Sequence, residues 1–97
     1  SNGFSDKRNV PSKLDIRPMT EVDVRGETAF DAVTIVDKAI DTAVLSGVNQ
    51  MTIIHGKGTG TLRAAVHQSL KKNKFIKTFR LGVYGEGEDG VTIVEFK

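Results

Sequence analysis

The 97-residue sequence has no cysteine, no tryptophan and only two prolines. Without cysteine, disulfide bonds and thiolate metal sites are excluded. No apolar run approaches the roughly 20 residues that a membrane-spanning helix needs, and no signal-peptide pattern opens the chain. Hydrophobic residues make up 38% and charged residues 27% of the chain, which is typical of a globular domain. We therefore expect one small cytoplasmic domain, cut from a longer protein, with no membrane partner.

Acidic residues are also absent from a long internal stretch, the one between Asp41 and Glu86. The net charge of the whole chain is only +2, so the basic residues are concentrated rather than numerous. Such a block is typical of a surface that meets a polyanion, although a solvated basic face gives the same pattern. The cations of this stretch are Lys57, Arg63, Lys71, Lys72, Lys74, Lys77 and Arg80.

The first 19 residues differ from the rest, because they are mainly polar and the first part has no periodicity. We interpret residues 1–19 as a linker with a lead-in strand, and residues 1–3 as a cloning remnant. Residues 13–18 (KLDIRP) and 21–26 (EVDVRG) share the order apolar-Asp-apolar-Arg, which predicts a short strand in each. The domain itself is predicted to span residues 20–97.

Hydrophobic periodicity predicts the order β-α-β-α-β-β in residues 20–97. Apolar residues at steps of three and four indicate two helices, the first capped by Thr28 and ended by Gly47. The predicted elements are a strand in 21–26, a helix over 28–46, a strand over 50–54, a helix from 62 to the basic cluster 71–74, and strands over 78–84 and 91–96.

This order predicts an α/β fold with two layers. Right-handed crossovers make the first three strands parallel, and a hairpin adds the last strand antiparallel. Two helices cover only one face of a mixed four-stranded sheet, so the other face stays open. Side chains alternate along a strand, so Val22 and Val24 should face the helices while Asp23 and Arg25 point away.

Chemically versatile side chains follow two of the predicted parallel strands. Asp23 and Arg25 come at the end of the first strand, and His55 and Lys57 follow the second. Because parallel strands joined by crossovers end on one edge of the sheet, we expect these residues to share a rim, where ligands of open α/β sheets bind.

Residues 53–60 (IIHGKGTG) contain three glycines in a short loop between a strand and a helix. The loop matches neither the P-loop nor the dinucleotide fingerprint. Glycines still allow backbone amides close to an anion, and a helix N-terminus favours negative charge. The alternative is a plain turn from strand to helix. The candidate phosphate contacts are Gly56, Gly58, Thr59, Gly60 and Arg63, with Lys57 as a point charge.

The rim residues each have a structural alternative. His55 is a candidate general acid or base, or a histidine that only holds the strand end. Asp23 could hold a metal, orient His55 or act as a base, or it could simply pair with Arg25 or Lys57. Arg25 cannot act as a base but can bind a phosphate with two parallel hydrogen bonds.

Other polar and aromatic residues are weaker candidates. Arg80, like Arg25, could bind a phosphate with two hydrogen bonds, or it is a solvated surface charge. The lysines at 71, 72, 74 and 77 either track a nucleic-acid backbone or do nothing specific. Tyr84 could stack on a base or border the core. His67 is expected mid-helix on the polar side, too far in sequence from His55 for an i, i+4 pair, and two histidines do not make a metal site.

The order of several motifs resembles that of the Smr (small MutS-related) domain. The motifs are VDVRG before an amphipathic helix, IIHGKGTGTLR, FRLG, an acidic glycine loop and GVTIVEFK. The chain is most similar to the version at the C-terminus of bacterial MutS-related proteins outside mismatch repair. The resemblance covers about residues 20–97. It implies a fold like the C-terminal domain of translation initiation factor three, which agrees with the predicted order.

The resemblance also implies nucleic-acid binding, and in several members cleavage or nicking of DNA or RNA. By this resemblance, the motif positions of the family correspond to Asp23, Arg25 and Gly26 and to the HGKGTG block. Many stand-alone Smr proteins have histidine where this chain has Arg25. This chain therefore lacks one group that could transfer a proton. The parent would be a dimeric ATPase acting in recombination suppression or ribosome rescue, while the isolated domain is expected to be a monomer.

Two functions therefore lead. The first is an endonuclease with Asp23, Arg25, His55 and Lys57 as catalytic residues, with no certain cofactor but with Mg²⁺ or Mn²⁺ as candidates on Asp23. The second is a non-catalytic module that binds nucleic acid or ribosomal RNA. A third, weaker candidate is a protein-interaction module that uses the open sheet face.

Overall fold

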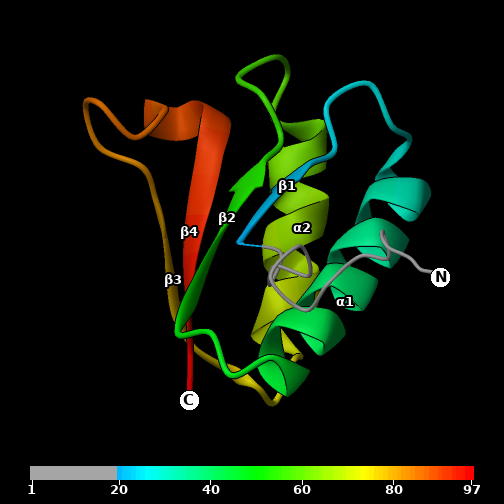
Figure 1. The fold of residues 1–97 in the computed structure, drawn as a ribbon. Coiled ribbons are helices and arrows are strands. Elements are labelled where there is room, and N and C mark those ends of the chain that lie inside the picture. Colours follow the sequence, from blue (N-terminus) through cyan, green and yellow to red (C-terminus); the bar gives the residue numbers. More distant parts are fainter. Residues whose placement is uncertain (1–19) are drawn as a thin grey trace, which may run out of the picture.

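The computed structural model describes residues 20–97, so the predicted lead-in strand and cloning remnant lie outside the described residues. The remaining chain has the predicted order of elements (Figure 1). They are β1 (Glu21–Asp23), α1 (Ala29–Leu45), β2 (Gln50–Ile54), α2 (Thr61–Lys71), β3 (Ile76–Leu81), the 3-10 turn η2 (Glu88–Gly90) and β4 (Val91–Phe96).

The limits of α1 follow from local chemistry. At the start, the Thr28 hydroxyl accepts a hydrogen bond from the Asp31 amide at 3.1 Å. At the end, Gly47 has a φ of +76°, a left-handed conformation that glycine adopts without a steric penalty. Between these caps, the apolar stripe is buried at Ala32, Val36, Ala39, Ile40 and Ala43.

The sheet has the strand order β1-β2-β4-β3. β1 pairs with β2 in parallel, and β4 pairs antiparallel with both β2 and β3. The predicted strand directions and the final hairpin are therefore confirmed. The returning strand β4 does not extend the sheet at its edge, because it lies between β2 and β3.

β3 was predicted over residues 78–84, but it runs over Ile76–Leu81. It begins earlier because Ile76 is buried in the core. It ends earlier because the following loop closes on itself: the Gly82 amide donates to the Glu88 carbonyl at 3.0 Å. Val83 and Tyr84 are consequently exposed in the loop rather than paired in a strand.

One face of the sheet packs on both helices, as Figure 1 shows. The core lies between these two layers, and the predicted inward side chains Val22 and Val24 belong to it. On the opposite face Asp23 and Arg80 are exposed, as expected for an open sheet face. Within residues 20–97, no helix is both long enough and apolar enough to cross a membrane.

Candidate functional site

The two rim segments meet as predicted. The Val24 amide donates to the Ile54 carbonyl at 2.9 Å, which continues the β1–β2 ladder to the end of both strands. Beyond it, the Arg25 side chain crosses Gly56. A Cβ atom at residue 56 would lie 3.3 Å from the Arg25 Cγ, and Gly56 has a φ of +84°. Glycine is therefore required here both for its backbone conformation and for the approach of Arg25.

A cleft of about 390 Å³ opens between these segments. Its far wall is the start of α2, where the N-cap Gly60 has a φ of +87° and no capping side chain of its own, and where the Thr61 amide donates to the Thr59 hydroxyl at 3.3 Å. The Arg63 guanidinium lies directly over Gly60. A helix N-terminus with two guanidinium groups attracts anions. The cleft is lined by Arg25, Gly26, Glu27, His55, Gly56, Gly58, Thr59, Gly60, Thr61, Leu62 and Arg63.

Asp23 does not line this cleft, because its carboxylate holds Arg25. The Arg25 Nη2 lies 2.6 Å from Asp23 Oδ2, its Nε lies 3.0 Å from Oδ1, and its backbone amide also donates to Oδ1. The hydrogen bonds from Arg25 lower the pKa of Asp23 to about 2. Asp23 is thus a weak base that orients Arg25, which corresponds to the ion-pair alternative of the sequence analysis.

His55 is buried beneath the cleft, and both of its ring nitrogens have partners. Nδ1 lies 3.1 Å from the Gly56 carbonyl oxygen, and Nε2 lies 2.8 Å from the Thr92 hydroxyl. Thr92 is itself fully buried on β4. His55 therefore connects the glycine loop to the centre of the sheet.

The expectation that His67 lies on the polar side of α2 was wrong, because its ring packs toward the sheet. Its ring is partly buried, its Nε2 lies 2.7 Å from the same Thr92 hydroxyl, and its ring centre is 6.0 Å from that of His55. The two histidines are distant in sequence, but the insertion of β4 beside β2 places Thr92 between them. Helical periodicity alone could not reveal a partner on another strand.

The pKa values of both histidines are lowered, chiefly by burial, because a charged imidazole loses hydration there. The nearby Arg63 guanidinium lowers both further. At neutral pH both rings are therefore neutral.

Lys57 points away from the cleft toward an acidic turn, whose residues were not among the predicted site residues. Its Nζ lies 3.0 Å from Glu88 Oε1 and 3.9 Å from Asp89 Oδ1, and the bond to Glu88 raises the pKa of Lys57. The turn is fixed to the glycine loop, since the His55 and Gly56 amides both donate to the Gly90 carbonyl. The acidic residues of 85–90 (GEGEDG) were the available signal, but only the position of β4 brings them here.

The remaining predicted cations lie away from the cleft. α2 has 11 residues, and at 1.5 Å per residue its C-terminal end is about 16 Å from the glycine loop. Arg80 lies on the edge strand β3 and pairs with both carboxylate oxygens of Glu86, at 2.8 and 3.1 Å. The exposed lysines at the far end of α2 and just beyond it are Lys71, Lys72, Lys74 and Lys77.

The site offers few ligands for a metal ion. Within residues 20–97, no group of three or more His, Cys, Asp or Glu side chains is arranged to hold one. A divalent cation at Asp23 would have to displace Arg25 from both carboxylate oxygens. The residues present therefore do not fit a metal held by the protein alone.

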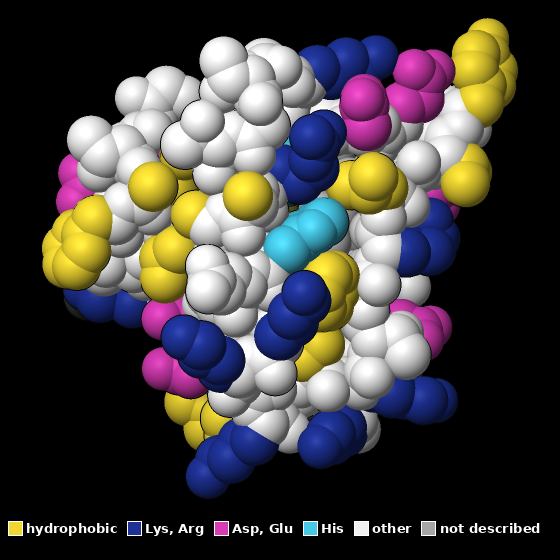
Figure 2. Space-filling view, turned by 180° about the vertical axis from the view of Figure 1, so that it is seen from behind, with side chains coloured by type: hydrophobic (Ala, Val, Ile, Leu, Met, Phe, Trp, Pro, Cys, Tyr) yellow, Lys and Arg dark blue, Asp and Glu magenta, His cyan; other side chains and the backbone are white. Residues whose placement is uncertain are grey.

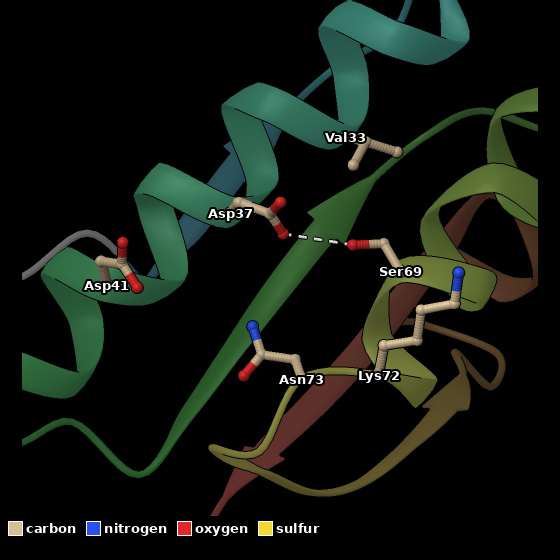
Figure 3. A pocket seen from close by; sticks show the side chains of 6 residues that line it. All are labelled: Val33, Asp37, Asp41, Ser69, Lys72 and Asn73. Carbon is tan, nitrogen blue, oxygen red and sulfur yellow. Dashed lines mark hydrogen bonds between the residues drawn. The ribbon is translucent and has the colours of Figure 1, made fainter.

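A second hollow, of about 480 Å³, lies between α1 and α2 (Figure 3). Asp37 and Asp41 project into it from α1, and the Ser69 hydroxyl donates to Asp37 Oδ1 at 3.1 Å. Among residues 20–97, Lys72 is the one basic residue that lines it. Despite its size, this acidic groove does not suit a phosphate.

Comparison with known proteins identifies the family. The Smr domain family model matches residues 22–97. The chain is 58% identical over 78 residues to "Endonuclease MutS2" of Ruminiclostridium cellulolyticum, covering 80% of this chain and 10% of that protein. It is 60% identical over 74 residues to "Endonuclease MutS2" of Caldanaerobacter subterraneus subsp. tengcongensis, covering 76% of this chain and 9% of the relative. The chain thus spans about a tenth of these relatives.

Two solved structures have the same fold. The crystal structure of the Smr domain of Thermus thermophilus MutS2 superposes with a TM-score of 0.79 at 39% identity, covering 81% of this chain and 99% of that one. YdaL, a stand-alone small MutS-related protein from Escherichia coli, has a TM-score of 0.77 at 19% identity, covering 80% and 64% of the two chains.

Proposed function

Because the chain belongs to the Smr domain family, we propose that it binds nucleic acid through a backbone phosphate seated in the cleft. One observation carries this proposal: Arg25, the N-terminus of α2 and Arg63 line a single cleft. Two guanidinium groups and backbone amides match the oxygens of a phosphodiester. Nothing in this set of donors reads a base, so the proposed binding is to the backbone.

Binding is tested with fluorescent DNA and RNA oligonucleotides, single-stranded and duplex, at several salt concentrations. The expected affinity falls as salt rises, because bound cations release counterions from the phosphates. The logarithmic salt slope of Arg25→Gln is expected to be smaller than that of the wild type. An exposed α1 variant, Lys38→Gln, serves as the matched control. Salt-independent affinity, or equal slopes for Arg25→Gln and the wild type, would contradict a phosphate at Arg25.

We further propose that the domain cleaves or nicks the bound strand as an endonuclease. The relatives named "Endonuclease MutS2" support this activity. Arg25 and Lys57 would stabilise the charge that develops on the phosphate, after Lys57 leaves Glu88. Asp23 orients Arg25, and His55 supports the glycine loop. Asp23 and His55 are also the only proposed proton acceptors, and both reach the substrate only by giving up a present hydrogen bond.

Cleavage is tested on supercoiled plasmid and on structured RNA, with EDTA, Mg²⁺ or Mn²⁺. We expect the wild type to nick and the triple variant Asp23→Ala, His55→Ala, Lys57→Ala to lose cleavage. A double variant on α1, Lys38→Ala with Asp41→Ala, is the folded control. Undiminished cleavage by the triple variant would reject this assignment, and the three metal conditions decide whether a cation is required.

A non-catalytic module that binds nucleic acid or ribosomal RNA is the second candidate. The specific observation in its favour is that both nitrogens of His55 and both oxygens of Asp23 already have partners. A proton acceptor is then available only after a rearrangement. Salt-dependent binding without any cut product, under all three metal conditions, would favour this candidate over the nuclease.

The wider role follows the relatives, of which this chain covers about a tenth. We propose that the domain is the C-terminal part of a cytoplasmic, homodimeric MutS-related ATPase that acts in recombination suppression or ribosome rescue. The domain alone would be a monomer that targets the ATPase to DNA or RNA. Size-exclusion chromatography with light scattering, on the domain and on the full-length protein, tests the two oligomeric states.

A further inference from the structure

One face of α2 carries three nitrogen-bearing side chains spaced four residues apart, the exposed Lys71 and the half-buried Arg63 and His67. Residues four apart lie on the same face of a helix and about 6 Å apart along its axis. This distance is similar to the separation of neighbouring phosphates along one strand. Figure 2 shows this surface from behind, with a histidine surface between Lys and Arg side chains. We call Arg63, His67 and Lys71 the α2 stripe.

The hydrogen bonds beneath the stripe determine which ring atoms carry protons. A carbonyl can only accept, so His55 must donate from Nδ1 to Gly56. Neutral His55 then accepts at Nε2 from the Thr92 hydroxyl. The Thr92 oxygen in turn accepts from His67 Nε2. His67 is therefore protonated on Nε2, and its Nδ1 has no hydrogen bond to any other residue of 20–97.

This arrangement separates the behaviour of the two histidines. His67 can take a second proton on Nδ1 while every existing bond remains. His55 cannot do so, because a proton on its Nε2 would turn this nitrogen from an acceptor into a donor. The Thr92 oxygen would then accept two hydrogen bonds, and the buried Thr92 hydroxyl proton would lose its present acceptor. The ring of His67 also borders an open hollow of about 450 Å³ together with Ala64, Gln68, Lys71 and Lys72. Only His67 is both able to gain charge and accessible to a ligand.

The groups around His67 explain why it is neutral in the free domain. Burial is the main cause that lowers its pKa, and the Arg63 and Lys71 cations on α2 lower it further, whereas His55, which follows β2, faces it as a neutral ring. The residues that contact it from β4 and β3, Thr92 and Phe79, carry no charge. The acidic turn contributes Asp89, whose carboxylate lies 3.9 Å from Arg63. A bound phosphate would reverse this balance, because a nearby negative charge favours the charged imidazole.

We propose that the α2 stripe binds the phosphodiester backbone that leaves the cleft, and that His67 takes up a proton when the strand binds. The proposal rests on the proposed function, because the cleft fixes where the strand begins. It assigns to His67 a role that depends on pH, while His55 remains neutral and structural. Arg63 belongs to both the cleft wall and the stripe, and so joins the two.

The direction of the pH effect follows from linkage. The pKa of His67 is expected to be higher in the bound state than in the free state. The extra affinity is then complete below the pKa of the free state and is lost as the pH rises through the pKa of the bound state. Uptake of one proton changes affinity by at most tenfold per pH unit, so we expect about three- to tenfold tighter binding at pH 6 than at pH 8.

The test measures anisotropy of fluorescein-labelled single-stranded DNA and RNA of 20 nucleotides at pH 6, 7 and 8, in EDTA at fixed ionic strength. His67→Gln is the informative variant, because its amide can still donate to Thr92 but cannot titrate. We expect its affinity to be independent of pH. Lys71→Gln should bind more weakly but keep the pH dependence, and Lys38→Gln should match the wild type.

NMR titration of the histidine Cε1–H signals, with and without the oligonucleotide, gives the second readout. We expect the pKa of His67 to rise on binding, while His55 stays neutral from pH 6 to 8. Binding that has the same pH dependence in His67→Gln and the wild type, or an unchanged pKa of His67, overturns the inference and leaves the proposed function standing. No binding by the wild type at any pH overturns both. Thermal unfolding of each variant identifies any loss of binding that results from misfolding.

Discussion

The cleft at the ends of β1 and β2 and the groove between α1 and α2 are comparable in size but opposite in character. Their volumes are about 390 and 480 Å³. The cleft presents two guanidinium groups and a helix N-terminus, whereas the groove presents two carboxylates. The charge and direction of the lining donors, rather than volume, therefore decide which hollow can hold a phosphate.

The first prediction removes the positive charge of the cleft. We expect Arg25→Gln with Arg63→Gln to weaken oligonucleotide binding by about 10- to 100-fold and to reduce the logarithmic salt slope by about 1.5 to 2. Anisotropy titrations across a range of salt concentrations measure both effects. Unchanged affinity would show that the strand does not enter the cleft.

The second prediction concerns the hydroxyl that supports the cleft from the core. Thr92→Val leaves His55 Nε2 and His67 Nε2 without their shared partner. An unsatisfied buried polar group costs about 1–3 kcal/mol, so the free energy of unfolding should fall by that amount. Urea denaturation measures it, and Thr92→Ser, which keeps the hydroxyl, is the control. Because valine keeps the γ-methyl group and lacks only the hydroxyl, a Thr92→Val variant as stable as the wild type would contradict this role of the hydrogen bonds.

The backbone of the cleft wall gives the third prediction. Gly60→Ala places a Cβ at a φ of +87° and against the Arg63 guanidinium. We expect a loss of about 1–2 kcal/mol of stability, seen as a lower melting temperature. Gly58→Ala is the matched control, since no atom lies within 4 Å of a Cβ there and its φ is not positive. Similar melting temperatures for the two variants would refute the special role of Gly60.

The acidic turn beside the cleft allows a finer test. Glu88→Asn with Asp89→Asn removes the partners of Lys57 and leaves its ammonium available to a phosphate. Asparagine also tolerates the positive φ of 53° at residue 88. Because exposed ion pairs are weak, we expect only about two- to fivefold tighter binding. The control is Glu21→Gln, which removes an acid from the open sheet face and should not change binding. Weaker binding by the double variant would contradict the idea that the acidic turn and the phosphate compete for Lys57.

The smallest effect is expected in the acidic groove. Asp37→Asn with Asp41→Asn neutralises it but should change oligonucleotide affinity by less than about twofold at 150 mM salt, because exposed charges are screened beyond about 8 Å. The same anisotropy assay applies. A gain comparable to that of the acidic-turn variant would mean that the strand also follows the helix groove.

Much of this architecture could be predicted from local patterns. The period of Ala32, Val36 and Ile40 indicated α1, and alternation at Val22 and Val24 indicated which face of β1 is buried. The glycines after β2 predicted an anion site at the rim, which stays a prediction, while Gly56 and Gly60 adopt the positive φ values that glycine reaches without a steric penalty. The position of β4 was not predictable in this way, because a hairpin has the same local sequence whether it returns at the edge or inside the sheet.

The site was correspondingly predicted in part. Asp23, Arg25, His55 and the glycine loop were expected at one rim, and the structure places them there. The partners of Lys57 and His67 were missed, because Glu88 and Thr92 lie far along the chain from the residues they contact. Which of these residues bind or cleave nucleic acid stays a prediction for the experiments above.

By itself, the sequence determined the elements, the buried faces, the family and the concentration of positive charge, all of which depend on residue type and short spacing. Only the tertiary structure decided that Asp23 holds Arg25, that an acidic turn holds Lys57 and that Thr92 joins two histidines. The reason is physical: these contacts depend on which strand lies beside β2, and strand order is set by the packing of the whole sheet on its two helices. No short spacing in the chain records that choice.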